Sequence, residues 1–463
     1  MIFACWTTSA NNSSYPDYSR SGKLICGEFI GSGLEYPKGV SISTRQFNRW
    51  GLGLLVLTAV CFHGCGLFTS STSSTSSTSS STERLYLGTG EYSPITHWHG
   101  ILRFENAQSL NTCGTSVSPN GTVDVWTVVG QDGVSLNFIH SFFVDESLDE
   151  IYVSSLFTST DPSINCQDGP SNPSINCGSI GVIRSASSID GSQILSRHIF
   201  GSATKINQAH GIWIDAVRNI LYAANTFGGN ILSWDSASTV SGNQAPSRIL
   251  TYSGLGAPVY VYVDTTDDRM FVAVMRNSSG NDPAILIYNN ASTLTGEQTP
   301  DLIINGDNTR ISTGNNQTTH NTWYDHDRKM LFVGHHTNEV LIFDLSTANF
   351  TPSSKPTQLN IAPRVLRINE QQDLSDKYDW SCYGMFYLPY NDRLYVAAGY
   401  TPGGTETQSG GPPQSGSPRQ AIKVYDNILS DTSKSGLVTP DRSIHWSNGT
   451  QFYPAQPLWV TKY

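Results

Sequence analysis

The sequence contains little charge. Only 14% of its 463 residues are Asp, Glu, Lys or Arg, and the formal net charge is −10. It has no basic patch with which to bind nucleic acid. From Cys65 onward the chain also lacks the G-x-S-x-G, H-E-x-x-H, C-x-x-C-H and P-loop motifs, so nothing in it marks those classes of enzyme. Its abundant Ser, Thr, Asn and Gly are typical of a secreted β protein with polar, uncharged loops.

A long hydrophobic run is missing as well. The apolar run from Trp50 to Phe62 is too short to span a bilayer, and Arg45 and Arg49 precede it, which is the pattern of an export signal. The run leads into F-H-G-C-G, where Cys65 follows a small residue. This segment resembles a bacterial lipoprotein signal, which implies that Cys65 is lipidated and becomes the mature N-terminus. Simple cleavage and an uncleaved anchor are the alternatives.

Cysteines are few after this segment, and they fit an oxidising compartment. The sequence P-S-I-N-C occurs twice in one long loop, ending at Cys166 and at Cys177. A disulfide between these two residues would hold an otherwise flexible insertion, and two free thiols are the alternative. Cys113 and Cys382 have no evident partner.

The strongest pattern in the chain is a repeat of sixteen residues that aligns five times without a gap. Each copy predicts a strand, a polar turn and a second strand. The fourth position is aromatic in every copy, and the sixth is Asp in four of them. The copies are HSFFVDESLDEIYVSS from His140, HGIWIDAVRNILYAAN from His210, VYVYVDTTDDRMFVAV from Val259, HNTWYDHDRKMLFVGH from His320 and YGMFYLPYNDRLYVAA from Tyr383.

Two columns of this alignment carry structural expectations. We expect the aromatic column to be buried between neighbouring sheets; it contains Phe143, Trp213, Tyr262, Trp323 and Phe386. We expect the Asp column to be structural, because each Asp ends a strand before a tight turn, where a carboxylate accepts hydrogen bonds from backbone N–H groups. That column contains Asp145, Asp215, Asp264 and Asp325.

Two further strands follow each pair, so four strands recur about every fifty to seventy residues, the signature of propeller blades. Near the N-terminus, the stretches from Leu85, Gly100 and Thr122 fit the second, third and fourth strands of another blade. Its first strand is supplied by QPLWVTKY from Gln456, which places Trp459 in the aromatic column. This pairing would close the ring and remove exposed sheet edges. The sequence therefore predicts an all-β fold, a six-bladed β-propeller of four-stranded antiparallel blades closed by the C-terminal strand.

The repeat unit resembles those of the NHL-type and related bacterial surface propellers, above all in HGIWID followed by NILSWDSASTVSGNQAP. The resemblance covers nearly everything from Leu85 onward and implies the fold, whereas such propellers serve as scaffolds, binding platforms and occasionally enzymes. We divide the chain accordingly. Residues 1–39 are an extension that is disordered or precedes a true start near Val40, 40–64 are the signal peptide, 65–84 are the lipidated Cys with a Ser/Thr-rich tether, and 85–463 are the propeller.

Three histidines, His140, His210 and His320, occupy the first position of the repeat. Equivalent positions at the start of the innermost strands form a ring around one mouth of the central channel, so the three side chains can face a common point. A six-bladed relative, the peptidylglycine amidating lyase core, binds zinc at its axis through histidines. By that resemblance the three residues would hold zinc or another transition metal, with Tyr383 as an acid or base. The alternative is that the histidines are structural and bond to backbone carbonyls.

The loops between second and third strands open at the same mouth, and insertions gather there, at 154–180, 276–283 and 401–418. Insertions on one face of a repeat ring usually mark the binding face. The sequence is consistent with three functions. The first is a lipid-anchored, extracytoplasmic propeller at the bacterial cell envelope, which binds an envelope protein, a polysaccharide or a small ligand without catalysis. The second is a metal-dependent lyase or hydrolase, and the third is a self-assembling surface protein.

Overall fold

The structure is a computed structural model, and it describes residues 82–90, 99–112, 117–124, 128, 130, 136, 139–156, 178–254, 256–275, 282–311, 319–335, 339–351, 356–368, 381–399, 421–444 and 458–462. The described residues do not include the expected signal peptide, the expected lipidation site Cys65, nearly all of the expected tether, or the cysteines Cys113, Cys166 and Cys177. Most of each inserted loop also lies outside them. Within the described residues, no helix is long and apolar enough to cross a membrane.

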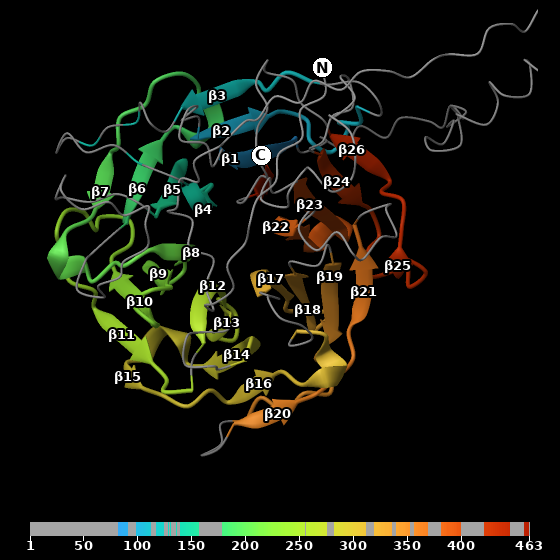
Figure 1. Cartoon of the computed structure of the whole chain (residues 1–463). Helices are drawn as coiled ribbons and strands as arrows, with labels where there is room; N and C mark the ends of the chain where they lie inside the picture. The colour runs from blue at the N-terminus through green and yellow to red at the C-terminus, as the bar shows by residue number, and fades with distance from the viewer. Residues whose placement is uncertain are drawn as a thin grey trace, which may run out of the picture. The chain divides into compact units, whose positions relative to one another are not determined.

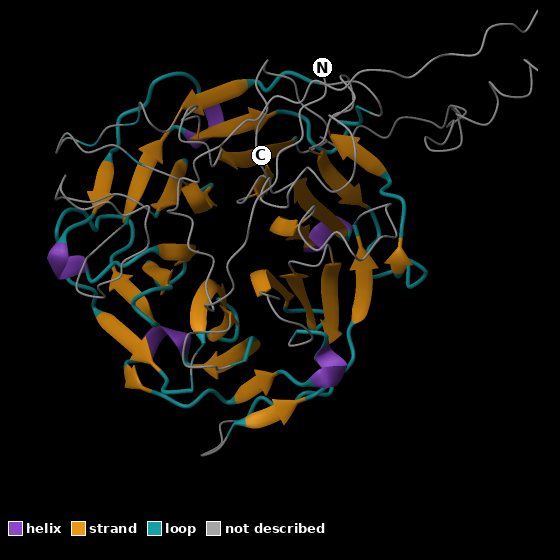
Figure 2. Cartoon of the chain, viewed as in Figure 1, coloured by secondary structure: helices purple, strands orange, loops and turns teal. Residues whose placement is uncertain are grey.

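The described strands form six sheets arranged around a common axis (Figure 1). Short 3-10 turns are the other regular elements among these residues (Figure 2). The predicted six-bladed β-propeller is therefore confirmed. The first three blades, from the innermost strand outward, are β27 (Leu458–Lys462), β1 (Glu83–Gly90), β2 (His99–Phe104) and β3 (Gly121–Asp124); β4 (Ile139–Asp145), β5 (Glu150–Ser155), β6 (Ser179–Arg184) and β7 (Arg197–Ile199); and β8 (Ala209–Asp215), β9 (Ile220–Asn225), β10 (Asn230–Asp235) and β11 (Arg248–Thr251).

The other three blades have the same order. They are β12 (Ala257–Asp264), β13 (Arg269–Met275), β14 (Ala284–Asn289) and β16 (Leu302–Ile304); β17 (Thr319–Asp325), β18 (Met330–His335), β19 (Glu339–Asp344) and β21 (Arg364–Arg367); and β22 (Ser381–Leu388), β23 (Arg393–Gly399), β24 (Ala421–Tyr425) and β26 (Arg442–Ile444). The 3-10 turns are η3 (Ala186–Ser188), η4 (Ser202–Thr204), η5 (Ala291–Thr293), η6 (Asp307–Thr309) and η7 (Pro389–Asn391).

The prediction of four strands per blade is incomplete for the third, fourth and fifth blades, which each carry a fifth strand. The extra strands are β15 (Gly296–Glu297), β20 (Thr357–Leu359) and β25 (Gly436–Leu437), and each pairs in parallel with the outermost strand of the blade before it in the chain. In the sequence, each extra strand lies between the third strand and the outermost strand of the following blade. These strands cover sheet edges that would otherwise expose unpaired backbone groups.

The blades share one register. In all six, the aromatic residue of the innermost strand lies opposite an aromatic residue of the second strand; the pairs are Trp459–Tyr86, Phe143–Tyr152, Trp213–Tyr222, Tyr262–Phe271, Trp323–Phe332 and Phe386–Tyr395. The second-strand rings are completely buried. Two of them reach the next blade, where the hydroxyl of Tyr86 donates to the carbonyl of Ala186 (3.0 Å) and that of Tyr152 to the carbonyl of Ala237 (3.2 Å). Blades that pack on both faces explain why both faces of these strands are apolar.

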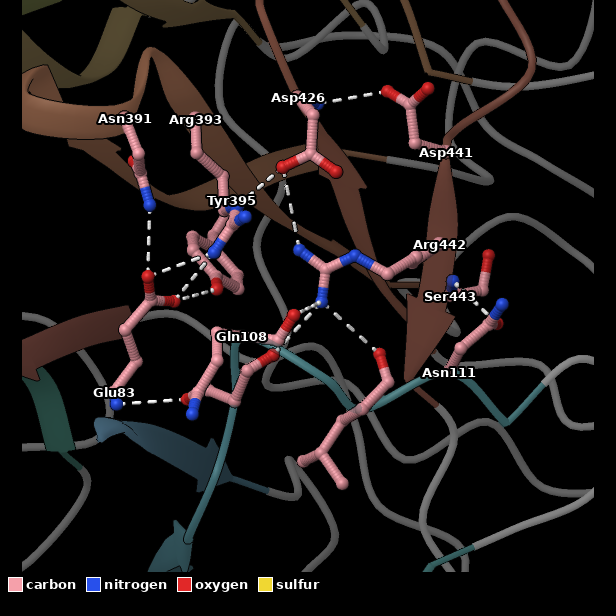
Figure 3. Close-up of polar contacts among 12 residues, drawn as sticks. Glu83, Gln108, Asn111, Asn391, Arg393, Tyr395, Asp426, Asp441, Arg442 and Ser443 are labelled. Atoms are coloured by element: carbon pink, nitrogen blue, oxygen red, sulfur yellow. Dashed lines mark hydrogen bonds and ion pairs between the residues drawn. The ribbon is translucent and has the colours of Figure 1, made fainter. Parts of the chain in front are cut away.

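The C-terminal strand closes the ring as predicted, because β27 pairs antiparallel with β1. A buried carboxylate joins this first blade to the sixth (Figure 3). Glu83, at the start of β1, is 3% exposed. It accepts hydrogen bonds from Tyr395 (2.6 Å), Tyr390 (2.8 Å), Asn391 (2.8 Å) and Nη1 of Arg393 (2.8 Å to each carboxylate oxygen). We call these five residues the closure latch.

Arg442 in β26 makes a second contact across the same seam (Figure 3). Its Nη1 donates to the backbone carbonyls of Ala107 (3.0 Å) and Gln108 (2.7 Å). Its Nη2 lies 3.5 Å from Asp426, which also pairs with Arg393 of the latch. The ring is therefore closed by backbone pairing within the first blade and by charged hydrogen bonds between the first and sixth blades.

Candidate functional site

The channel axis is occupied by tryptophans from alternate blades. Trp459, Trp213 and Trp323 belong to the first, third and fifth blades. Their ring centroids are 5.4 Å (Trp213 to Trp323), 5.6 Å (Trp213 to Trp459) and 5.9 Å (Trp323 to Trp459) apart. Residues from blades that are not neighbours approach this closely only where the blades converge. The aromatic column of the repeat therefore points to the axis.

Smaller aromatic rings fill the gaps between the tryptophans. Phe143, Tyr262 and Phe386 come from the remaining blades, and each lies 4.4–5.2 Å from the two tryptophans beside it. We call the six side chains the axial plug. The expectation that the aromatic column is buried between neighbouring sheets is wrong in direction, because these rings pack against one another across the centre of the propeller. The plug divides the channel into two separate mouths.

A β-bulge explains how the first repeat position reaches the channel. In the five blades that begin with the sixteen-residue repeat, the register between the first two strands shifts around this position. In the second blade, for example, Ile139 and Ser141 lie opposite the consecutive residues Ser155 and Ser154, so His140 is the extra residue. A bulge re-aims a side chain that regular alternation would direct elsewhere.

The three predicted histidines are brought together at one mouth, which we call the histidine mouth. The ring of His140 stacks on that of His210, with centroids 4.1 Å apart and 29° between the planes. It lies 6.1 Å from the ring of His320, with 25° between the planes. Because the second and fifth blades face each other across the ring, a contact between His140 and His320 places both over the axis. Phe227, in the turn between β9 and β10, lies 6.5 Å from His210 and is 46% exposed.

The surroundings keep the imidazoles of His140 and His210 uncharged. Burial lowers the pKa of His140 from 6.5 to about 4, although a hydrogen bond to the backbone of His210 opposes the shift. Burial, followed by repulsion from His140, holds the pKa of His210 well below its usual value. Nδ1 of His210 is buried and has no hydrogen-bond partner among the described residues. At neutral pH the mouth therefore carries stacked neutral rings.

Neutral imidazoles are competent metal ligands, but these rings are stacked face to face, whereas a metal lies in the plane of each imidazole that binds it. Zinc at His140, His210 and His320 therefore requires the rings to rotate, and it remains a prediction. Tyr383 occupies the equivalent position in β22, and its side chain lies outside the described part of the structure. Within the described part, the potential ligand atoms that converge belong to Asp264, Asp267 and His326, at the opposite mouth.

This opposite mouth, which we call the aspartate mouth, is where the Asp column ends the innermost strands. Each carboxylate accepts a hydrogen bond from a backbone N–H two or three residues later; the pairs are Asp145 with Ser147 (2.9 Å), Asp215 with Arg218 (2.9 Å), Asp264 with Thr266 (3.1 Å) and Asp325 with Arg328 (3.0 Å). The structural interpretation of the column is confirmed. These carboxylates shape the turns that surround the mouth.

A second polar column, at the tenth repeat position, was missed from the sequence. Its five residues have φ between +51° and +57°; they are Asp149, Asn219, Asp268, Lys329 and Asp392. Four of them accept a hydrogen bond from the backbone N–H of a serine in an outer turn of the same blade; the pairs are Asp149–Ser187 (2.7 Å), Asn219–Ser238 (2.8 Å), Asp268–Ser292 (3.0 Å) and Asp392–Ser430 (2.8 Å). The column is visible as a run of Asp and Asn in the alignment, and recurring A-S-S and A-S-T triplets supply three of the serines.

Comparison with known proteins shows no family. No protein-family model and no curated protein matches the chain. The similar solved structures include a nidogen–laminin complex (12% identity, TM-score 0.44, 82% of this chain and 98% of that one) and a candidate 6-phosphogluconolactonase of Bacteroides fragilis (11%, 0.43, 84% and 100%). A third is the hydrazine synthase of Kuenenia stuttgartiensis (13%, 0.37, 65% and 70%). At these identities and TM-scores, the likenesses carry no argument about what this chain does.

Proposed function

We propose that this chain is a non-catalytic binding or scaffold protein of the cell envelope, anchored through a lipid on Cys65, and that its partner docks at the histidine mouth. The axial plug is the observation that carries the proposal. Because six aromatic rings fill the axis, the channel is closed. The axial plug forms the bottom of the histidine mouth, where a partner can bind. The inserted loops that the sequence places at this mouth would form its walls.

The side chains at the histidine mouth favour binding over catalysis. Burial is the largest cause of the lowered pKa of both His140 and His210, and the other causes are a backbone hydrogen bond and the influence of His140 on His210. General acid–base catalysis is most efficient when the pKa of the ionisable group lies near the working pH, and burial moves the pKa of both histidines away from neutral pH. Stacked neutral imidazoles and the exposed ring of Phe227 instead offer flat surface and hydrogen-bonding atoms, which suit recognition.

Photocrosslinking in intact cells tests this proposal. A benzoylphenylalanine at Phe227 replaces one aromatic side chain with another at the histidine mouth. The same residue at Leu437, which is 45% exposed on the outermost strand β25, is the matched control. We expect a discrete adduct from position 227 that is absent from position 437 and is lost when His210 is changed to Ala. Equal crosslinking from both positions, or none from position 227, would contradict docking at this mouth.

The convergence of His140, His210 and His320 supports a second candidate, a metal-dependent lyase or hydrolase. Elemental analysis of the purified wild-type protein beside the triple Ala variant separates the two functions. About one equivalent of zinc or copper in the wild type and none in the variant would favour the enzyme. Absence of metal from both would leave the binding function.

Two further measurements test the anchor and the assembly alternative. Fatty-acid labelling and membrane fractionation should both depend on Cys65, and a Cys65→Ala variant that still labels and still fractionates with membranes would refute lipidation there. Sedimentation at micromolar concentration should show monomers. Concentration-dependent oligomers would favour the self-assembling surface protein instead.

A further inference from the structure

The chain enters the propeller on the side of the aspartate mouth. The innermost strands end at this mouth, and the second strands, which are antiparallel to them, begin there. Glu83, the first residue of β1, accordingly lies opposite Lys462 at the end of β27. We call the turns between first and second strands, together with the connections between third and fourth strands, the aspartate face. The residues that precede Glu83 therefore join the propeller at this face.

Exposed apolar side chains gather on the aspartate face. In the turns between first and second strands, Val217 is 77% exposed, Tyr390 51% and Leu148 47%. Ile194, in the connection from β6 to β7, is 74% exposed. Among the large apolar side chains that are exposed in the described part of the chain, Phe227 is the one at the histidine mouth. The two faces of the propeller therefore differ in character.

These side chains surround the point where the chain enters. Leu148 belongs to the second blade and Tyr390 to the sixth, and these blades lie on either side of the first (Figure 1). Val217 belongs to the third blade. The aligned turns of the fourth and fifth blades instead expose polar residues such as Thr266 and Asp327. The aspartate face therefore has an apolar half centred on the first blade and a polar half opposite to it.

Hydrogen bonds join the turns of successive blades around the mouth. The pairs are Arg218 with the carbonyl of Thr265 (2.9 Å), His326 with Asp264 (2.8 Å), Arg328 with the carbonyl of Pro389 (3.3 Å) and Tyr390 with Glu83 (2.8 Å). Glu146 of the second blade accepts a hydrogen bond from the backbone of Lys462 in the first. The apolar side chains are thus presented on connected turns, so little conformational entropy is lost when they bind a surface.

We propose that the apolar half of the aspartate face docks on the lipid bilayer that holds the anchor, with Leu148, Val217 and Tyr390 in the interfacial region. This inference rests on the lipid anchor of the proposed function. A flexible tether over residues 65–82 has a span of about 23 Å. To turn the histidine mouth to the bilayer, the tether would also have to pass the depth of a blade, about 20 Å for strands of six or seven residues.

A bilayer suits this pattern better than a protein partner does. The apolar side chains lie on separate turns with polar residues between them, and each can enter the membrane interface by itself. A stable protein interface instead needs about 1,000 Å² of complementary surface. Tyr and Lys are typical of membrane interfaces, and Nζ of Lys462 lies 4.3 Å from the centre of the Tyr390 ring. Because the tether makes docking intramolecular, weak contacts suffice.

Fluorescence quenching by brominated lipids tests the proposal on the full-length, lipidated protein in vesicles of phosphatidylethanolamine and phosphatidylglycerol. A genetically encoded dansyl amino acid is placed at position 148 or 217 as the reporter. Position 266, which aligns with 217 in the fourth blade, and position 227, at the histidine mouth, are the matched controls. We expect brominated acyl chains to quench the two reporters by about half and the two controls by less than about a tenth.

A pair of substitutions separates docking from proximity alone. Val217→Gln should lower the quenching at position 148 at least about twofold, because it removes an apolar contact with the bilayer, and Thr266→Gln should leave it unchanged. Equal quenching at all four positions, or none at 148 and 217 in protein that carries its lipid, would overturn the docking and leave the anchor standing. Protein without a fatty acid on Cys65 that stays off the vesicles would overturn both. Unquenched reporters, together with a benzoylphenylalanine at position 217 that crosslinks to a protein in cells, would overturn the proposal in favour of a protein partner.

Discussion

Replacement of Glu83 by Gln should destabilise the propeller at its seam. Glu83 lies at the first residue of β1, and its four partners come some three hundred residues later in the chain. Gln keeps the size of the side chain and one acceptor oxygen, but it removes the charge that faces Arg393 and turns the other oxygen into a donor. The substitution therefore tests the closure latch without leaving a cavity.

The magnitude can be worked out from the contacts. Breaking a buried ion pair by removing one partner costs about 3–5 kcal/mol, because the other charge stays buried. Arg393 keeps Asp426 as a partner, which places the expected loss at the lower end, about 3 kcal/mol. Glu105→Gln is the control, since Glu105 lies in the same blade and pairs with Arg84 (2.8 Å), but its side chain is 26% exposed. A pair of that kind is worth about 1 kcal/mol or less.

Denaturant unfolding, followed by circular dichroism, would compare the two variants with wild type. Hydrogen exchange should also become faster in peptides from β1 and β27 of the Glu83→Gln variant and stay unchanged in β10. The reason is that loss of the latch should favour local opening at the seam between the first and sixth blades. A loss of stability no larger than that of Glu105→Gln would refute the reasoning. So would accelerated exchange spread evenly over all six blades.

Three further predictions concern the plug, the turns and the buried histidines. Trp213→Ala should lower the free energy of unfolding by about 4 kcal/mol, because its ring contacts four others, and Trp213→Phe should cost clearly less; equal losses in denaturant titrations would contradict packing on the axis. Asp268→Ala removes the acceptor for Ser292 and should cost about 1–2 kcal/mol, and Asp268→Asn, which keeps an acceptor, should cost less than half of that in thermal unfolding; the reverse order would exclude the turn contact. Burial lowers the pKa of His335 to about 4, so below about pH 6.5 the unfolded chain binds a proton that the folded protein does not, and this histidine alone should lower stability by up to about 3 kcal/mol between about pH 6.5 and 4, in addition to the contributions of His140 and His210. His335→Gln should flatten this part of a stability–pH curve, and an unchanged slope would show that other groups cause it.

Much of the fold was predictable because its signals are local and repeated. Apolar runs bounded by polar turns predict strands at any one copy, and sixteen-residue copies in register predict blades. The incomplete first blade and the unpaired stretch at Gln456 fit each other, so the ring closure could also be predicted. The carboxylates of the Asp column act on their own turns, two or three residues away, which is why their structural role was evident from the sequence.

The candidate sites depended on where the blades meet. The sequence placed aromatic residues in a column but not on the axis, because their direction depends on a bulge at the preceding positions and on six blades converging. The stacking of His140 on His210 and the latch at Glu83 both join residues from different blades. The alternation of side chains along a strand is local and sets which residues share a face. Which faces then meet at the centre is a property of the closed ring, and only the tertiary structure decides it.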